Sequence, residues 1–197
     1  MYELVAADAL AADQSASLRA IYERGYTAAE RAPWHRVSLD HPNNETLALM
    51  RDDVPVGFAS THPLSDTGRI LLRYPVIDGD LRGRGLGALL WQRVTELASQ
   101  RGFAQLVWDV APNDDEPATE HEEQDSQLRR IGFFERLGGS LLPIGEYASS
   151  PGAGTRWVPM RLLATSLDGS ALATDPWTLR RVALEVCAYR YQLGVRV

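Results

Sequence analysis

Apolar residues in the first part of the chain form four short runs, typical of strands, and one segment with helical spacing. The runs predict strands at residues 1–7, 46–51, 54–62 and 69–77. A helix is predicted over residues 8–24 and is expected to end at Gly25. Its apolar positions include Leu10, Leu18, Ile21 and Tyr22. Asp52 and Asp53 separate the second and third strands, which are therefore expected to form a hairpin.

The later part of the chain mixes helical spacing with three further apolar runs. Helices are predicted at residues 88–98, 126–137 and 176–193, and strands at residues 102–110, 140–147 and 156–164. Asp175 is a favourable N-cap for the last helix, and Pro176 a favourable first residue. The apolar side of this helix is predicted to hold Trp177, Val182, Val186 and Tyr189. It is expected to pack on the sheet or on a second copy of the chain.

Two segments lack a regular pattern. Residues 26–44 contain Trp34 and His35, which are expected to pack within the core or a loop; contact with a substrate is the alternative. Residues 111–125 are expected to form a polar, solvated loop. The acidic residues of this segment are Asp114, Asp115, Glu116, Glu120, Glu122, Glu123 and Asp125.

The order of the elements favours an α+β fold built around an antiparallel meander. A length of 197 residues is typical of a single domain with a sizeable core. Residues 1–164 are expected to form this core, and residues 165–197 a C-terminal helical extension.

The most informative stretch is Arg82-Gly83-Arg84-Gly85-Leu86-Gly87, which lies between a predicted strand and a predicted helix. The first amides of a helix have no partner within the helix, and the helix dipole adds partial positive charge there. Glycines leave room for an anion to approach these amides, and the two arginines add full charges. The stretch therefore predicts a binding site for a diphosphate.

Two other interpretations of the glycines remain open. In the first interpretation, the glycines only allow a tight turn that needs positive φ and bind no ligand. They also match a permissive dinucleotide fingerprint, Gly83-x-Gly85-x-x-Ala88, with Asp109 near the position of the acidic residue that this fingerprint requires. Three hairpin strands precede the glycines, however, and no further strand–helix–strand units follow, which disfavours the dinucleotide fold.

Composition narrows the function further. The formal net charge is −6, which argues against a nucleic-acid-binding protein. The sequence has no lysine, which excludes a Walker phosphate loop and a catalytic lysine. Cys187 is the single cysteine, so neither an intrachain disulfide nor a cysteine metal cluster can form, and no metal site is expected. Neither a signal peptide nor a membrane-spanning run is evident, so a cytoplasmic protein without membrane contact is expected.

The glycine stretch resembles the pyrophosphate loop of the GCN5-related N-acetyltransferase (GNAT) superfamily, with Arg82, Gly85 and Gly87 at the signature positions. Residues 133–138, Phe-Phe-Glu-Arg-Leu-Gly, are similar to a second motif of that family. The resemblance implies a mixed, mostly antiparallel sheet of about seven strands flanked by helices, with the last helix as an addition. It also implies acetyl-CoA as the acyl donor. The residues it assigns to acyl-CoA binding are Val76, Ile77, Arg82, Gly83, Arg84, Gly85, Leu86, Gly87 and Phe134.

The chain departs from the family pattern at three catalytic positions. Phe134 replaces a tyrosine that serves the leaving thiolate, and Leu71 stands where a glutamate base is common. The amide that polarises the thioester falls at Pro75, which has no N–H, unless the register is shifted by one residue. Asp109 as base and Tyr147 as acid are the substitutes that the sequence offers.

Two functions are therefore carried forward. The first is an N-acyltransferase that moves an acetyl group directly from acetyl-CoA to an amine of a small molecule or peptide. The acidic segment 111–125 is then either solvated or a rim that attracts a cationic acceptor. The second is an acyl-CoA-binding sensor or regulatory module with impaired chemistry. A homodimer through the last helix is compatible with both functions.

Overall fold

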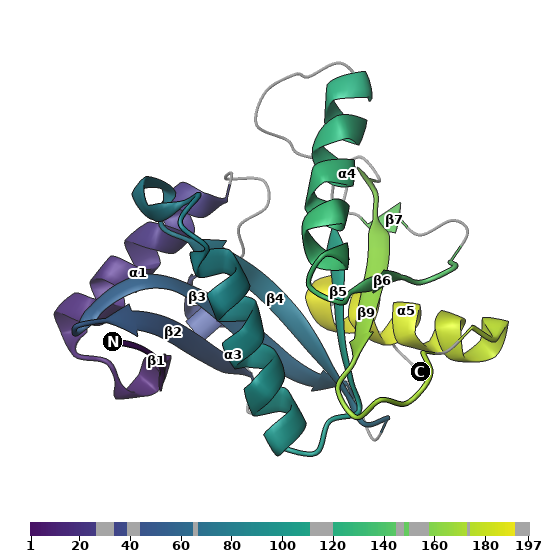
Figure 1. The fold of residues 1–197 in the computed structure, drawn as a ribbon, viewed down its shortest axis with the longest axis horizontal. Helices are drawn as coiled ribbons and strands as arrows, with labels where there is room; N and C mark the ends of the chain where they lie inside the picture. Colours follow the sequence, from purple (N-terminus) through teal and green to yellow (C-terminus); the bar gives the residue numbers. More distant parts are fainter. Residues whose placement is uncertain are drawn as a thin grey trace. The chain divides into compact units, whose positions relative to one another are not determined.

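The computed structural model describes residues 1–26, 34–38, 44–64, 67–110, 120–144, 148–149, 158–172 and 174–191. It confirms the expected α+β class, with a seven-stranded, mostly antiparallel sheet and flanking helices (Figure 1). The chain divides into two compact units. The first comprises Met1–Pro63 and Ile70–Gly102, and the second comprises Leu64–Arg69 and Phe103–Val197.

Four strands of the sheet belong almost entirely to the first unit, in the order β1-β2-β3-β4. They are β1 Tyr2–Ala6, β2 Glu45–Arg51, β3 Val54–Leu64 and β4 Arg69–Ile77. The predicted hairpin of β2 and β3 is confirmed, with antiparallel pairing from Glu45–Thr61 to Arg51–Val54. Asp52 and Asp53 turn it with φ of 48° and 63°, which short polar side chains tolerate better than most.

The helical elements of the first unit are η1 Ala7–Ala9, α1 Ala12–Gly25, α2 Trp34–Ser38, η2 Gly79–Leu81 and α3 Leu86–Gln100. The single helix predicted from residue 8 is wrong at its start, because Leu10 and Ala11 are extended. The core between α1, α2 and the strands is built from apolar and aromatic residues: Leu18, Ile21, Tyr22, Val37, Ala48, Met50, Phe58, Tyr74 and Val76.

The second unit has a three-stranded part of the sheet in the order β5-β9-β6, with both pairs antiparallel. Its strands are β5 Gln105–Val110, β6 Ser140–Leu141 and β9 Arg161–Ser166, and β7 Ala148–Ser149 pairs with β8 Val158–Pro159 as a separate ribbon. Its helices are α4 Glu120–Glu135 and α5 Pro176–Tyr191. No helix of the described residues is long and apolar enough to cross a membrane.

The expectation of a loop up to residue 125 is wrong in its last part, because α4 begins at Glu120. Carboxylates are favoured in the first turn of a helix, where they face the positive end of its dipole. The acidic residues from Glu120 to Asp125 are therefore a helix-start signal as well as a mark of polarity. Residues 111–119 of this segment lie outside the described residues.

The predicted strand at residues 140–147 is reduced to Ser140–Leu141. The amide of Leu142 still donates to the carbonyl of Leu162 at 2.9 Å, but Pro143 follows and has no N–H to continue the ladder. β9 keeps the predicted strand character and extends to Ser166, opposite Gln105.

The last helix has the predicted start, and its predicted apolar face is confirmed at Val182 and Val186 but wrong at Trp177. The amide of Thr178 donates to Oδ1 of Asp175 at 2.9 Å, which confirms Asp175 as the N-cap. Leu179, Val182 and Val186 are buried, whereas Trp177 is 81% exposed. At about 100° per residue, Trp177 lies roughly 200° from Leu179 around the helix, which places it on the opposite side. Cys187 in this helix is partly exposed.

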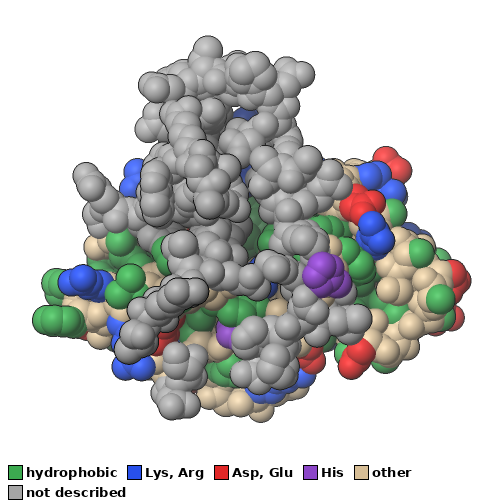
Figure 2. Space-filling view, turned by 180° about the vertical axis from the view of Figure 1, so that it is seen from behind, with side chains coloured by type: hydrophobic (Ala, Val, Ile, Leu, Met, Phe, Trp, Pro, Cys, Tyr) green, Lys and Arg blue, Asp and Glu red, His purple; other side chains and the backbone are tan. Residues whose placement is uncertain are grey.

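Charged side chains do not gather by sign on the face drawn in Figure 2. Among the described residues, arginines there are interspersed with aspartates and glutamates. This distribution agrees with the formal net charge of −6. On that face the described residues present no continuous basic surface of the kind that nucleic acids require.

Candidate functional site

The glycine stretch connects η2 to α3 in the first unit. Gly83 and Gly85 have φ of 74° and 78°, a region that residues with a side chain rarely adopt. Gly85 is the N-cap of α3, and its carbonyl accepts the amide of Leu89 at 3.1 Å. A β-carbon built on Gly83 or Gly85 meets no atom within 4 Å. The glycines are therefore required by backbone conformation, and the space above them is open within the described structure.

The start of α3 presents hydrogen-bond donors and positive charge. Its first turn contains no acidic residue, and its N-cap has no side chain to satisfy the first amides. Arg82 and Arg84 are both exposed, and Nε of Arg82 donates to the carbonyl of Ile77 at 3.4 Å. A diphosphate fits this combination of exposed amides, helix dipole and guanidinium groups.

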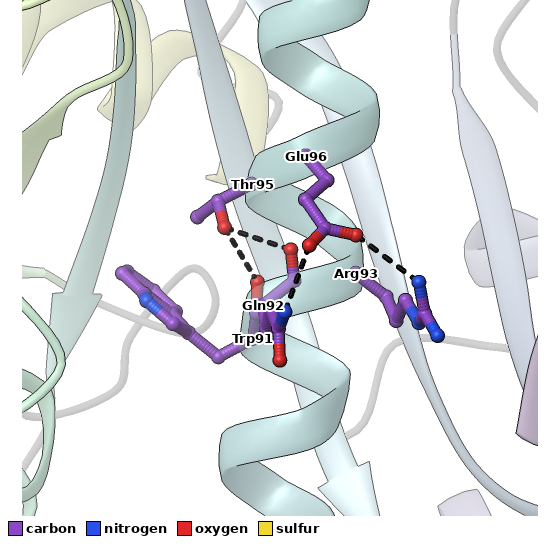
Figure 3. A network of polar contacts seen from close by, with 5 residues as sticks. All are labelled: Trp91, Gln92, Arg93, Thr95 and Glu96. Carbon is purple, nitrogen blue, oxygen red and sulfur yellow. Dashed lines mark hydrogen bonds and ion pairs between the residues drawn. The ribbon is translucent and has the colours of Figure 1, made fainter.

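α3 itself is firmly attached to the first unit. Leu86, Leu90, Trp91, Val94 and Ala98 are buried on one side of the helix. Figure 3 shows the polar contacts of its middle turns, where Glu96 accepts from Gln92 at 2.8 Å and from Arg93 at 3.2 Å. Just beyond its C-terminus, Arg101 makes a bidentate pair with Glu45 of β2, and this hydrogen bond raises the pKa of Arg101. The glycine loop therefore leads into a helix that packs on the first unit from Leu86 to Ala98.

Strand β4, which leads into the loop, is irregular near its end. Tyr74 has φ of 48°, although it lies within a strand, and Pro75 is exposed between buried neighbours. Pro75 has no N–H, so the next amide along the chain is that of Val76. The side chains of Val76 and Ile77 are 6% and 9% exposed. A shift of one residue from the predicted register therefore places a residue with a backbone N–H, Val76, at this position.

Sequence reasoning missed the aromatic cluster around Tyr74. Its ring centroid lies 5.3 Å from that of Tyr22 and 5.3 Å from that of Tyr26, both edge-on. Trp34 belongs to the same cluster, 5.5 Å from Tyr22 and 5.8 Å from Phe58, which confirms the expected packing role. No motif marks these rings, but the separation of Tyr22 and Tyr26 by four positions at the end of a predicted helix is a signal that could have grouped them.

Asp109 and Phe134 belong to the second unit. Asp109 lies near the end of β5, opposite Leu162, and is partly buried. Phe134 extends from α4, with its ring 5.0 Å from that of Trp108. The side chain of Gln127 fixes α4 to the same strand by donating to the carbonyl of Val110 at 3.0 Å.

Other residues singled out from the sequence contribute less to the described site. Tyr147 lies outside the described residues, so its role stays a prediction. Leu71 is completely buried and has no titratable group. His35 is exposed on α2. No group of three or more histidine, cysteine or carboxylate side chains within the described ranges could hold a metal ion.

Comparison with known proteins points to one family. A family model described as "Acetyltransferase (GNAT) family" matches residues 15–138. No curated protein sequence matches the chain. A GNAT-family protein from Bacteroides thetaiotaomicron has a similar structure, with a TM-score of 0.68, 18% identity and coverage of 96% of this chain and 98% of that one.

Two similar structures are enzymes with stated acceptors. The ribosomal-protein-S18-alanine N-acetyltransferase from Escherichia coli has a TM-score of 0.60 and 17% identity, covering 87% of this chain and 97% of its own. An aminoglycoside 6'-N-acetyltransferase complexed with coenzyme A has a TM-score of 0.61 and 15% identity, covering 86% and 99%. At these identities the likeness shows the fold that the three structures share with this chain.

Proposed function

Because the chain belongs to the acetyltransferase (GNAT) family, we propose that it transfers an acetyl group from acetyl-CoA to an amine. The observation that carries this proposal is the open glycine loop at the start of α3, with left-handed Gly83 and Gly85 and two exposed arginines beside it. An anionic diphosphate is the ligand that such a loop accommodates best.

The donor site that we propose is formed mainly by the end of β4 and the glycine loop, both in the first unit. The amides from Gly83 to Gly87 face the diphosphate, and Arg82 and Arg84 balance its charge. Val76 and Ile77 line the acyl end of the donor. Phe134 replaces the family's tyrosine and contributes apolar contact.

The chemistry requires four groups in addition to the donor. The neutral amine attacks the thioester carbonyl, a C–N bond forms, and the C–S bond breaks to release a thiolate. We assign the amide of Val76 to the developing oxyanion, since Pro75 cannot donate there. Asp109 is the proposed base that takes the amine proton, and Tyr147 is the proposed acid that protonates the thiolate.

The proposed acceptor is an amine of a small molecule or peptide. The two enzymes of similar structure act on an alanine of ribosomal protein S18 and on an aminoglycoside, as their names state, and both are N-acetyltransferases. A cationic acceptor would be attracted by the acidic residues between Asp114 and Asp125. Salt should weaken that attraction, because the Debye length is about 8 Å at physiological ionic strength.

The departures at Leu71 and Phe134 support a second candidate, an acyl-CoA-binding module that no longer catalyses transfer. One experiment separates the two. Acetyl-CoA binding is measured by calorimetry, and release of free CoA is followed with a panel of small amines and N-terminal peptides. Amine-dependent release supports the enzyme, binding without release supports the module, and the absence of binding contradicts both.

A further inference from the structure

Residues 24–26, at the C-terminal end of α1, contact the end of β4 and the residue that follows it. Arg24 Nη2 pairs with Oδ2 of Asp78 at 2.9 Å. A β-carbon on Gly25 would overlap the Cγ2 methyl of Val76, so the backbone of Gly25 packs directly against the side chain of Val76. The hydroxyl of Tyr26 donates to the carbonyl of Pro75 at 3.2 Å. These contacts all lie within the first unit.

Tyr26 also packs on Tyr74, the residue with the unusual backbone. The two rings are 5.3 Å apart and nearly perpendicular, and the guanidinium carbon of Arg73 lies 4.8 Å from the centroid of the Tyr74 ring. A left-handed conformation at an aromatic residue costs free energy and persists only where surrounding contacts stabilise it. Tyr22 of α1 and Tyr26, the residue after α1, supply such contacts.

The contacts fall at two ends of the proposed donor site. Tyr74 and Pro75 precede the amide of Val76, which we assign to the acyl group. Asp78 precedes η2 and the glycine loop, and its carbonyl accepts the amide of Leu81 at 2.9 Å. Three consecutive residues at the end of α1 therefore contact the start of both regions.

We propose that residues 24–26 are a positioning element for acyl transfer, an inference that depends on the proposed function. Tyr26 orients the strand at the acyl end through Tyr74 and Pro75. Arg24 orients the strand end ahead of the diphosphate loop through Asp78. Neither side chain needs to contact the reacting atoms for this role, so both are positioning residues.

The two contacts should have separable effects on kinetics. Tyr26→Phe keeps the ring and its packing but removes the hydrogen bond to Pro75. We expect kcat to fall about three- to tenfold, because small misplacement near the reacting groups slows chemistry. The dissociation constant for acetyl-CoA should stay within about twofold, since the diphosphate loop is unchanged.

Arg24→Gln should have the opposite effect, with a change in acetyl-CoA affinity and little change in kcat. The pair with Asp78 is partly exposed, with side chains 59% and 20% accessible. Its loss is therefore expected to raise the dissociation constant for acetyl-CoA by only about two- to fivefold. kcat should stay within about twofold. Asp78→Asn, which removes the other partner, should reproduce this change.

A matched control lies on the same helix. Arg19 pairs with Glu23 at 2.7 Å on the exposed side of α1 and makes no described contact with β4. Arg19→Gln should leave both constants unchanged. The double variant Arg24→Gln/Tyr26→Phe should combine the two separate effects, since they act at different steps.

The measurements are steady-state kinetics with acetyl-CoA and an amine, calorimetry with CoA, and a thermal melt of each variant. A folded Tyr26→Phe protein that behaves like Arg19→Gln, while the wild type turns over, overturns the inference and leaves the proposed function standing. An affinity loss in Tyr26→Phe with unchanged kcat also overturns it. A wild type that binds no acetyl-CoA rejects the proposed function, and the positioning role with it.

Discussion

A β-carbon on Gly139 would lie 2.8 Å from two ring carbons of Trp108, so the indole packs directly against the backbone of this glycine. Trp108 is only 2% exposed and has little space to move. Gly139→Ala should therefore lower the free energy of unfolding by about 1–3 kcal/mol, as other overpacked cores do. Thermal or urea unfolding followed by circular dichroism measures this change.

Gly132 provides the opposite control in the same unit. It lies inside α4, where an added β-carbon would be 3.6 Å from Nη1 of Arg136, an ordinary contact. Gly132→Ala should increase the free energy of unfolding by about 0.5–1 kcal/mol, because alanine loses less backbone entropy in a helix. Equal effects of the two alanines would contradict the packing assigned to Gly139.

Gly87→Glu tests the diphosphate site without disturbing the helix. Gly87 is the second residue of α3, where a carboxylate is compatible with the helix dipole, so folding should be retained. The new negative charge would face the diphosphate, and affinity for acetyl-CoA should fall at least about tenfold. Calorimetry checks this, with Arg93→Gln on the polar side of α3 as a control. Unchanged affinity in folded Gly87→Glu would exclude the loop as the donor site.

The start of α5 should give a pH-dependent contribution to stability. The backbone amide of Thr178 donates to the carboxylate of Asp175 and lowers its pKa below the ordinary value of 3.8. A carboxylate whose pKa is lowered in the folded state stabilises it above the ordinary pKa, and this stabilisation disappears as the pH falls through the lowered value. Asp175→Ala should therefore be less stable than wild type at neutral pH and approach it in acid.

Asp175→Asn separates the cap from its charge. Asparagine is also a good N-cap but does not titrate in this range. This variant should keep most of the stability at neutral pH and lose the part of the pH dependence that comes from Asp175. Melting temperatures of the wild type, Asp175→Ala and Asp175→Asn are measured between about pH 2 and about pH 7. This range spans the ordinary aspartate pKa of about 4. If the melting temperature of Asp175→Asn depends on pH as strongly as that of the wild type, the pH dependence comes from groups other than Asp175.

Tyr147→Phe tests the proposed general acid. A well-placed acid contributes about 10²- to 10⁴-fold, so kcat should fall at least about tenfold while acetyl-CoA affinity is preserved. Phe134→Leu should instead act through packing, because its ring contacts Trp108, and should change CoA affinity more than kcat. If Tyr147→Phe turns over as fast as the wild type, Tyr147 is not the general acid, and solvent would be the proton donor to the thiolate.

Much of the fold was predictable because local signals and the final structure agree. Strand β4 has the predicted bounds, and the hairpin turn falls at the two predicted aspartates. α4 ends at Glu135, two residues before the predicted end, with Gly138 left-handed and the amide of Gly139 donating to the carbonyl of Phe134 at 2.9 Å. In each case the signal depends on a few neighbouring residues.

The features that escaped prediction depend on contacts between distant residues. Nothing local marks Tyr74 for a left-handed conformation, which is stabilised by rings some fifty positions earlier in the chain. Trp177 was assigned to the apolar face because it is apolar, although its phase on the helix differs from that of Leu179. The glycine loop between a strand and a helix could be predicted because its glycines lie within one short stretch, whereas the proposed catalytic groups come from separate elements.

The open space above Gly83 and Gly85 has a consequence for how the loop can change over evolution. Since backbone handedness is the constraint there, asparagine, which adopts the left-handed region more readily than other residues, is the substitution most compatible with the unliganded loop. A relative with asparagine at either position could keep the turn and lose only room for the ligand. Glycine retained at both positions across relatives would thus record selection for binding, separately from selection for folding.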